Sequence, residues 1–151
     1  MRTLLFLLPV AFSVAAQAAP GFKQSVPFPA FESWAKGAAV SGVAFQEAKD
    51  EAEAYVALFK AAGGTETLTV KIEGAGKFEG LAAGAAPFTW KGLEARFLAT
   101  GKGTSNGALI TVKYGDAKST LSLTFAASPK ARTQADMEKL LAAFKPEKIL
   151  K

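Results

Sequence analysis

The chain has 151 residues, half of them hydrophobic, and a formal net charge of +5, so it is long enough to bury one core without cross-links. It contains no cysteine and no histidine. These absences exclude disulfides, thiol chemistry, Ser-His-Asp and Cys-His catalysis, and histidine-ligated zinc hydrolysis. A non-enzymatic role is favoured, because catalysis is left with carboxylates, lysine, tyrosine or a Ser-Lys pair.

The first residues have the pattern of an export signal. Arg2 precedes an apolar run over Leu4–Ala16, and Ala16-Gln17-Ala18 has the small-x-small spacing that a signal peptidase recognises. A membrane anchor is the alternative, but a spanning helix needs about 20 apolar residues and this run is shorter. We expect a signal peptide over residues 1–18, cleaved after Ala18, and no transmembrane segment after it. The mature chain is then periplasmic or secreted.

Residues 19–42 form a lead-in segment rich in proline and aromatic residues. Phe31 and Trp34 are three apart, so a short helical turn beginning near Pro29 places both rings on one side. The rings either pack on the core or form a patch for a ligand or partner. Packing is favoured, because aromatic side chains are usually buried. We expect residues 43–151 to form a single α+β domain.

Residues 43–62 carry apolar side chains at helical spacing. The members of this stripe are Phe45, Ala48, Ala52, Tyr55, Val56 and Phe59. Charged residues fill most of the remaining positions, and Gly63-Gly64 is a suitable C-terminal stop. We therefore expect an N-terminal helix here.

The pattern then changes to alternation, which is typical of strands. Thr67–Glu73 places three aliphatic side chains on one side and polar ones on the other. The connection over 74–87 is rich in small residues and is expected to hold, at most, a short strand around Phe78. Phe88–Thr100 is expected to form one strand with a bulge at Gly92, where the alternation changes phase.

Residues 101–107 are expected to form a hairpin loop; they are rich in glycine but lack the spacing of a phosphate-binding loop. Ala108–Tyr114 and Ser119–Ala126 then alternate regularly and predict a hairpin. Thr133 and Asp136 have the spacing of a capping box, which predicts a final helix that ends before Pro146. This order of elements predicts an α+β two-layer sandwich. Its antiparallel sheet has about four to five strands, with an N-terminal and a C-terminal helix packed on one face.

The outward strand positions form the first candidate site, because they gather hydroxyls and cations: Thr67, Thr69, Lys71, Thr89, Lys91, Arg96, Thr111, Lys113, Thr120, Ser122 and Thr124. Antiparallel strands place such residues side by side, which suits an anionic lipid headgroup or glycan. The main candidates are Lys71, Lys91, Arg96, Thr111 and Lys113. The simpler interpretation is an ordinary solvated sheet face, which commonly carries threonine and lysine.

The second candidate site is an apolar pocket between helices and sheet. The chain has 12 phenylalanines and 2 tryptophans, many rings for one domain, and ligand pockets are mostly apolar. Phe45, Phe59, Trp90 and Phe97 are the candidate lining residues. The simpler interpretation is that the rings fill the core at ordinary density. We assign no catalytic residue, metal ligand or cofactor.

The sequence therefore favours an exported, non-enzymatic domain that acts through a binding surface on a protein or cell-envelope component. The first alternative is a carrier that holds a small apolar ligand or lipid between helices and sheet. The second is an enzyme based on carboxylate or lysine chemistry. Nucleic acid is not expected as a partner, because the chain is predicted to be exported and has no compact basic cluster.

Overall fold

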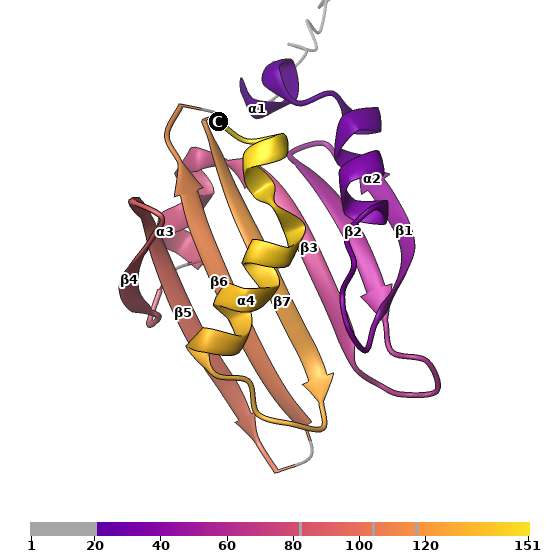
Figure 1. Cartoon of the computed structure of the whole chain (residues 1–151). Helices are drawn as coiled ribbons and strands as arrows, with labels where there is room; N and C mark the ends of the chain where they lie inside the picture. Colours follow the sequence, from indigo (N-terminus) through magenta and orange to yellow (C-terminus); the bar gives the residue numbers. More distant parts are fainter. Residues whose placement is uncertain (1–20, 82, 104, 117) are drawn as a thin grey trace, which may run out of the picture.

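The computed structural model describes residues 21–81, 83–103, 105–116 and 118–151. Seven strands form one antiparallel sheet in the order β1-β2-β3-β7-β6-β5-β4 (Figure 1). The strands are β1 (Ala44–Asp50), β2 (Ala54–Lys60), β3 (Thr67–Gly74), β4 (Ala86–Trp90), β5 (Leu93–Lys102), β6 (Ser105–Tyr114) and β7 (Ser119–Ser128). The predicted signal peptide, residues 1–18, lies outside the described residues.

Four α-helices and two 3₁₀ turns accompany the sheet in the described ranges. They are α1 (Gly21–Ser25), α2 (Phe28–Lys36), η1 (Ala75–Lys77), α3 (Phe78–Leu81), α4 (Gln134–Phe144) and η2 (Pro146–Lys148). Figure 1 shows α2 and α4 lying over the same face of the sheet. We call this the helix face and the opposite one the outer face. No helix within the described ranges is long and apolar enough to cross a membrane.

The core lies between the sheet and the helices α2 and α4. Phe144 of α4 contacts the ring of Phe59 on β2, with centroids 5.6 Å apart, and the ring of Trp34 on α2, at 5.4 Å. Phe31 of α2 packs on Tyr55 of β2 at 5.3 Å. The predicted α+β architecture is thus confirmed in its main features: an antiparallel sheet contacted by an N-terminal and a C-terminal helix.

The helix expected over residues 43–62 is wrong, because this segment forms the β1–β2 hairpin. Tyr55 and Phe59 are buried on the helix face, opposite Ile72 and Leu68 of β3. Residues four apart share a side in a helix and in a strand, so these two rings fit both patterns. The N-terminal helix that contacts the sheet is α2 instead, where Phe31 and Trp34 lie on one side as expected, with centroids 5.8 Å apart.

Three further expectations need correction. Phe78 begins the helix α3 and does not lie in a strand. Residues 88–100 belong to two strands, β4 and β5, because Lys91 and Gly92 both have positive φ (48° and 81°) and form a tight turn where we expected a bulge. The sheet therefore has seven strands and not four to five: the β1–β2 hairpin adds two, and the division at this turn adds another.

The last part of the chain agrees closely with the sequence pattern. The β6–β7 hairpin places Val112 opposite Leu121 and Ile110 opposite Leu123, all four buried. The α4 helix begins with the expected capping box: the Asp136 backbone N–H donates to the Thr133 hydroxyl, and the Thr133 N–H donates to the Asp136 carboxylate.

Candidate functional site

A pocket of about 310 Å³ opens on the helix face where the β4–β5 turn approaches the segment after α4. We call it the Trp90 pocket, and its lining residues are Trp90, Lys91, Leu93, Tyr114, Glu147, Leu150 and Lys151. Trp90 and Leu93 flank the two-residue turn and pair with each other. The η2 turn carries Glu147, and the Leu150 N–H donates to the Pro146 carbonyl at 2.8 Å, which holds Leu150 against the sheet.

Tyr114 supplies a buried polar group to this pocket. Its side chain is 5% exposed, and its hydroxyl has no hydrogen-bond partner among the described residues. Burial, together with the nearby Glu147 carboxylate, raises the pKa of Tyr114 well above its ordinary range. The phenol therefore stays protonated at neutral pH and is a free hydrogen-bond donor. An unpaired buried hydroxyl costs about 1–3 kcal/mol, so its presence calls for an explanation.

Lys91 lies at the mouth of the Trp90 pocket. Its ammonium is 4.8 Å from the centroid of the Trp90 ring and 3.8 Å from a carboxylate oxygen of Glu147. Both partners of this ion pair have side chains more than half exposed. An exposed pair at this distance is weak, about 0–1 kcal/mol, so the ammonium is available to another partner.

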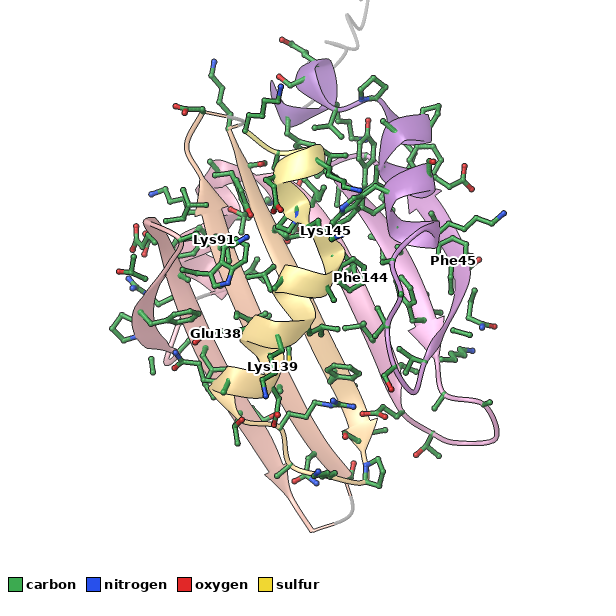
Figure 2. All side chains as sticks on the ribbon, viewed as in Figure 1. Phe45, Lys91, Glu138, Lys139, Phe144 and Lys145 are labelled. Carbon is green, nitrogen blue, oxygen red and sulfur yellow. The ribbon has the colours of Figure 1, made fainter. Side chains whose placement is uncertain are left out.

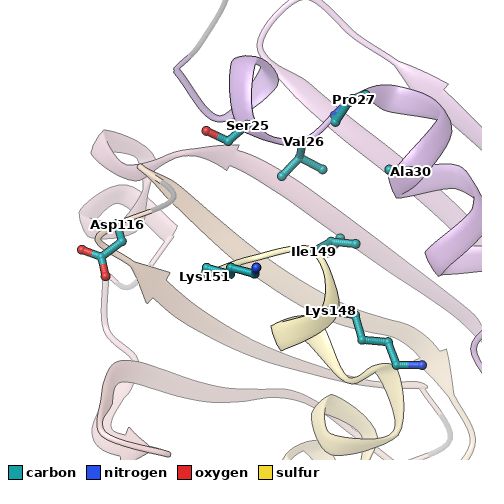
Figure 3. Close-up of a pocket in the computed structure, with 8 residues that line it drawn as sticks. All are labelled: Ser25, Val26, Pro27, Ala30, Asp116, Lys148, Ile149 and Lys151. Atoms are coloured by element: carbon teal, nitrogen blue, oxygen red, sulfur yellow. The ribbon is translucent and has the colours of Figure 1, made fainter.

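A second hollow, of about 390 Å³, lies on the other side of the C-terminal segment (Figure 3). Its lining residues are Ser25, Val26, Pro27, Ala30, Asp116, Lys148, Ile149 and Lys151. Lys151 lines both hollows, so the segment of residues 149–151 forms the wall between them.

Most of the predicted cationic face is brought together on the outer face. Lys71, Thr111 and Arg96 belong to one row across the sheet, and Lys113 to the next, by the register of β3, β7, β6 and β5. Lys91 is not part of it, because the turn directs its ammonium towards Trp90 on the helix face.

Carboxylates and a phenylalanine ring occupy much of this outer face. Glu94 lies 2.9 Å from the Arg96 guanidinium and 4.0 Å from the Lys113 ammonium. The buried ring of Phe78, from α3, lies 5.6 Å from each of these two cationic groups. Thr111 is fully buried there, with its hydroxyl unpartnered among the described residues. The cations at this end are therefore already engaged.

The four residues of the predicted apolar pocket do not line one cavity. Phe45 and Phe59 pack edge to face, at 5.6 Å, on the β1–β2 side of the sheet. Trp90 ends β4, the strand at the opposite edge, and Figure 2 shows Phe45 and Lys91 at opposite sides of the molecule. Phe97 lies on β5, opposite Ile110 of β6. Of the four, Trp90 alone lines the Trp90 pocket.

Sequence reasoning missed Tyr114 as a pocket residue, together with Glu147, Leu150 and Lys151. The alternation of Ala108–Tyr114 places Tyr114 on the same side as Ile110 and Val112, but nothing in that alternation indicates that its hydroxyl is unpartnered among the described residues. Glu147 and Lys151 reach Trp90 because α4 ends at Phe144 and η2 turns the chain back, which only the packed structure reveals.

Within the described residues there is no cluster of three or more carboxylates arranged to hold a metal ion. No protein-family model matches the sequence, and no curated protein and no solved structure is significantly similar to it.

Proposed function

We propose that the chain is an exported, non-enzymatic protein that binds a small ligand in the Trp90 pocket. The observation that carries this proposal is Tyr114, which lines the pocket and whose buried hydroxyl has no partner among the described residues. Buried polar groups in folded proteins are nearly always paired, and a ligand acceptor supplies the missing partner. The predicted signal peptide over residues 1–18 supports the export.

The size and lining of the pocket support a small ligand with an apolar body. Ligand sites range from about 300 to 1,000 Å³ and combine apolar walls with a few placed polar groups. The pocket volume of about 310 Å³ lies at the lower end of that range. Trp90, Leu93 and Leu150 give the apolar wall, and Tyr114 fixes the orientation of a bound acceptor.

The chemistry of the lining supports binding and not turnover. A phenol whose pKa is raised is a poor base and a poor nucleophile at neutral pH. Glu147 and Lys91 are largely exposed and neutralise each other, so neither has the buried surroundings that usually tune a catalytic group.

The test is an NMR screen of one-ring and short-chain fragments against the ¹⁵N-labelled chain from Ala19, in which the indole N–H signals of Trp34 and Trp90 are followed. We expect hits that shift the Trp90 signal and leave the Trp34 signal in place. Tyr114→Phe is expected to weaken these hits about five- to tenfold, the worth of one hydrogen bond. Ser119→Ala is the matched control, because it removes a second unpartnered buried hydroxyl that does not line the pocket. Hits that leave Trp90 unperturbed, or no hits, contradict the proposal.

A second candidate function is docking of a protein or cell-envelope component on the outer face. It is favoured by one row of this face, which runs Leu58, Thr69, Thr124, Leu109 and Leu98 across five strands. All five side chains are half-buried. Three partly exposed leucines in one row suit a partner with an apolar centre. Lys71 and Arg96, in the neighbouring row, would bind an anionic rim of that partner by exchanging their present partners, Glu73 and Glu94.

A further inference from the structure

The backbone of Lys91 is the first clue to the kind of ligand. A two-residue turn with positive φ at both positions prefers asparagine, aspartate or glycine at the first. Lys91 occupies that position at φ 48°, followed by Gly92 at 81°. Among the described non-glycine residues with positive φ, Lys91 is the one that lines the Trp90 pocket. The chain thus keeps a lysine where other residues fit the backbone better.

The groups around the pocket mouth are matched to an acceptor. Among the residues described, nothing accepts a hydrogen bond from the Tyr114 hydroxyl, which is therefore a donor without a partner. The Lys91 ammonium lies over the Trp90 ring and covers the electron-rich face to which a ligand cation would bind. A cationic ligand would also have to displace Lys91 from Glu147. A carboxylate meets both donors at once, because its two oxygens accept hydrogen bonds and carry the opposite charge.

We propose that the ligand of the Trp90 pocket is a small carboxylic acid with an apolar ring or short chain. Its carboxylate accepts from the Tyr114 hydroxyl and pairs with Lys91, and its apolar part lies against Trp90, Leu93 and Leu150. This inference rests on the proposed function and adds the charge of the ligand. A cavity of roughly 150 Å³ holds a benzene ring, so the pocket has room for one ring and a short acidic arm.

Glu147 competes with the ligand for the same ammonium. Its carboxylate lies 3.8 Å from Lys91, and its side chain is 58% exposed, so it is free to turn into solvent when a ligand binds. If the ligand is an acid, Glu147→Gln is expected to tighten its binding, because the competing charge is removed. If the ligand is a cation, the same substitution weakens binding.

The experiment titrates matched fragments, each as the acid, the amide and the amine, into the chain from Ala19 and its variants. 3-Phenylpropionate, 3-phenylpropionamide and 3-phenylpropylamine form one such set. The Trp90 indole signal gives each dissociation constant. We expect the acids to bind about tenfold more tightly than the amides, the worth of one charge-assisted hydrogen bond. Lys91→Asn is expected to abolish that difference while the amides bind as before.

Lys145→Asn is the matched control. Lys145 is also a lysine at positive φ (50°), and it does not line the Trp90 pocket. Lys145→Asn therefore changes the net charge and the backbone preference in the same way as Lys91→Asn, but away from the pocket. Equal binding of acid and amide, or tighter binding of the amine, overturns the assignment of an acid and leaves the proposed pocket standing. If no member of any set shifts the Trp90 signal, both the acid ligand and the proposed function are overturned.

Discussion

The indole nitrogen of Trp34 donates a hydrogen bond of 2.6 Å to the main-chain carbonyl of Phe144. This bond joins α2 to the last turn of α4, where carbonyl groups have no partner within the helix. It is buried, and the two aromatic rings are in contact beside it. This contact therefore ties together the two helices that cover the sheet, each of which also packs on the sheet through its own rings.

We expect Trp34→Phe to lower the free energy of unfolding by about 2–3 kcal/mol, because the Phe144 carbonyl is left buried and unpaired. Urea denaturation followed by circular dichroism measures the loss. Phe28→Leu is the control on the same helix: its ring is half-buried and donates no hydrogen bond, so we expect a loss below about 1.5 kcal/mol. Equal losses for the two variants would contradict the role given to the hydrogen bond.

Tyr114→Phe is expected to leave the free protein as stable as before, or to stabilise it by up to about 1 kcal/mol. The reason is that the Tyr114 hydroxyl is buried with no partner in the part of the chain that the structure describes, and its removal relieves that desolvation cost. Thermal unfolding with and without a pocket ligand separates the two effects, since ligand stabilisation should fall while intrinsic stability does not. A clear loss of stability in the free protein would indicate that the hydroxyl is paired.

Lys91→Asn is expected to stabilise the protein by about 0.5–1 kcal/mol, because asparagine adopts positive φ with less strain than lysine. Lys91→Ile should do the opposite, since a β-branched residue fits this conformation worst. The midpoint of thermal unfolding ranks the three proteins. If isoleucine is tolerated as well as asparagine, the turn does not impose this conformation in solution.

Acid should weaken the protein in part through Asp136 and Glu66. The hydrogen bond from the Thr133 backbone lowers the pKa of Asp136. Burial opposes ionisation of Glu66, but hydrogen bonds from Arg132 and Ser128, together with the charge of Arg132, outweigh it and lower the pKa of Glu66 as well. A carboxylate whose pKa is lower in the folded state stabilises above its unfolded pKa, near 4, and loses this contribution as pH falls through the folded value.

Glu66→Gln and Asp136→Asn should therefore reduce stability at pH 6 and flatten its decline between about pH 4 and pH 2. Urea midpoints at a series of pH values give the slopes. Thr133→Ala removes the capping hydroxyl and should cost about 1 kcal/mol at neutral pH. Parallel pH curves for the wild type and both carboxylate variants would exclude these groups as the source of acid sensitivity.

A separate prediction concerns binding through the outer face. If it docks on an anionic envelope surface, binding to vesicles that contain phosphatidylglycerol should weaken with salt and be lost in the double variant Lys71→Glu with Lys113→Glu. The control is the double variant Lys139→Glu with Lys145→Glu, which changes the net charge by the same amount on the helix face (Figure 2). Its binding to the vesicles should be impaired less than that of the first double variant. Equal loss in both double variants would mean that net charge alone drives the binding.

The sequence predicted correctly those elements whose formation depends on residues close together along the chain. The capping box at Thr133 and the alternation through Leu121 and Leu123 depend on neighbours along the chain, and both agree with the structure. The β1–β2 hairpin was missed because its turn, residues 51–53, contains neither glycine nor proline, and because Tyr55 and Phe59 are also spaced as in a helix.

The candidate site was less predictable for a different reason. Trp90, Tyr114 and Glu147 come from three separate segments, and they meet only because β4 is an edge strand and η2 turns back towards it. Inward and outward positions could be read from the alternation. Which inward groups are left without a hydrogen-bond partner depends on packing, which no periodicity encodes.

The order of the strands also bears on how the chain folds. Every pairing joins strands that follow each other in sequence, except the one between β3 and β7. The β1–β3 and β4–β7 meanders can therefore form early from short-range contacts, whereas the β3–β7 pairing must close the longest loop and is expected to limit the folding rate. Until it closes, each half exposes an unpaired strand edge, so nascent copies are most exposed to mispairing with one another at that stage.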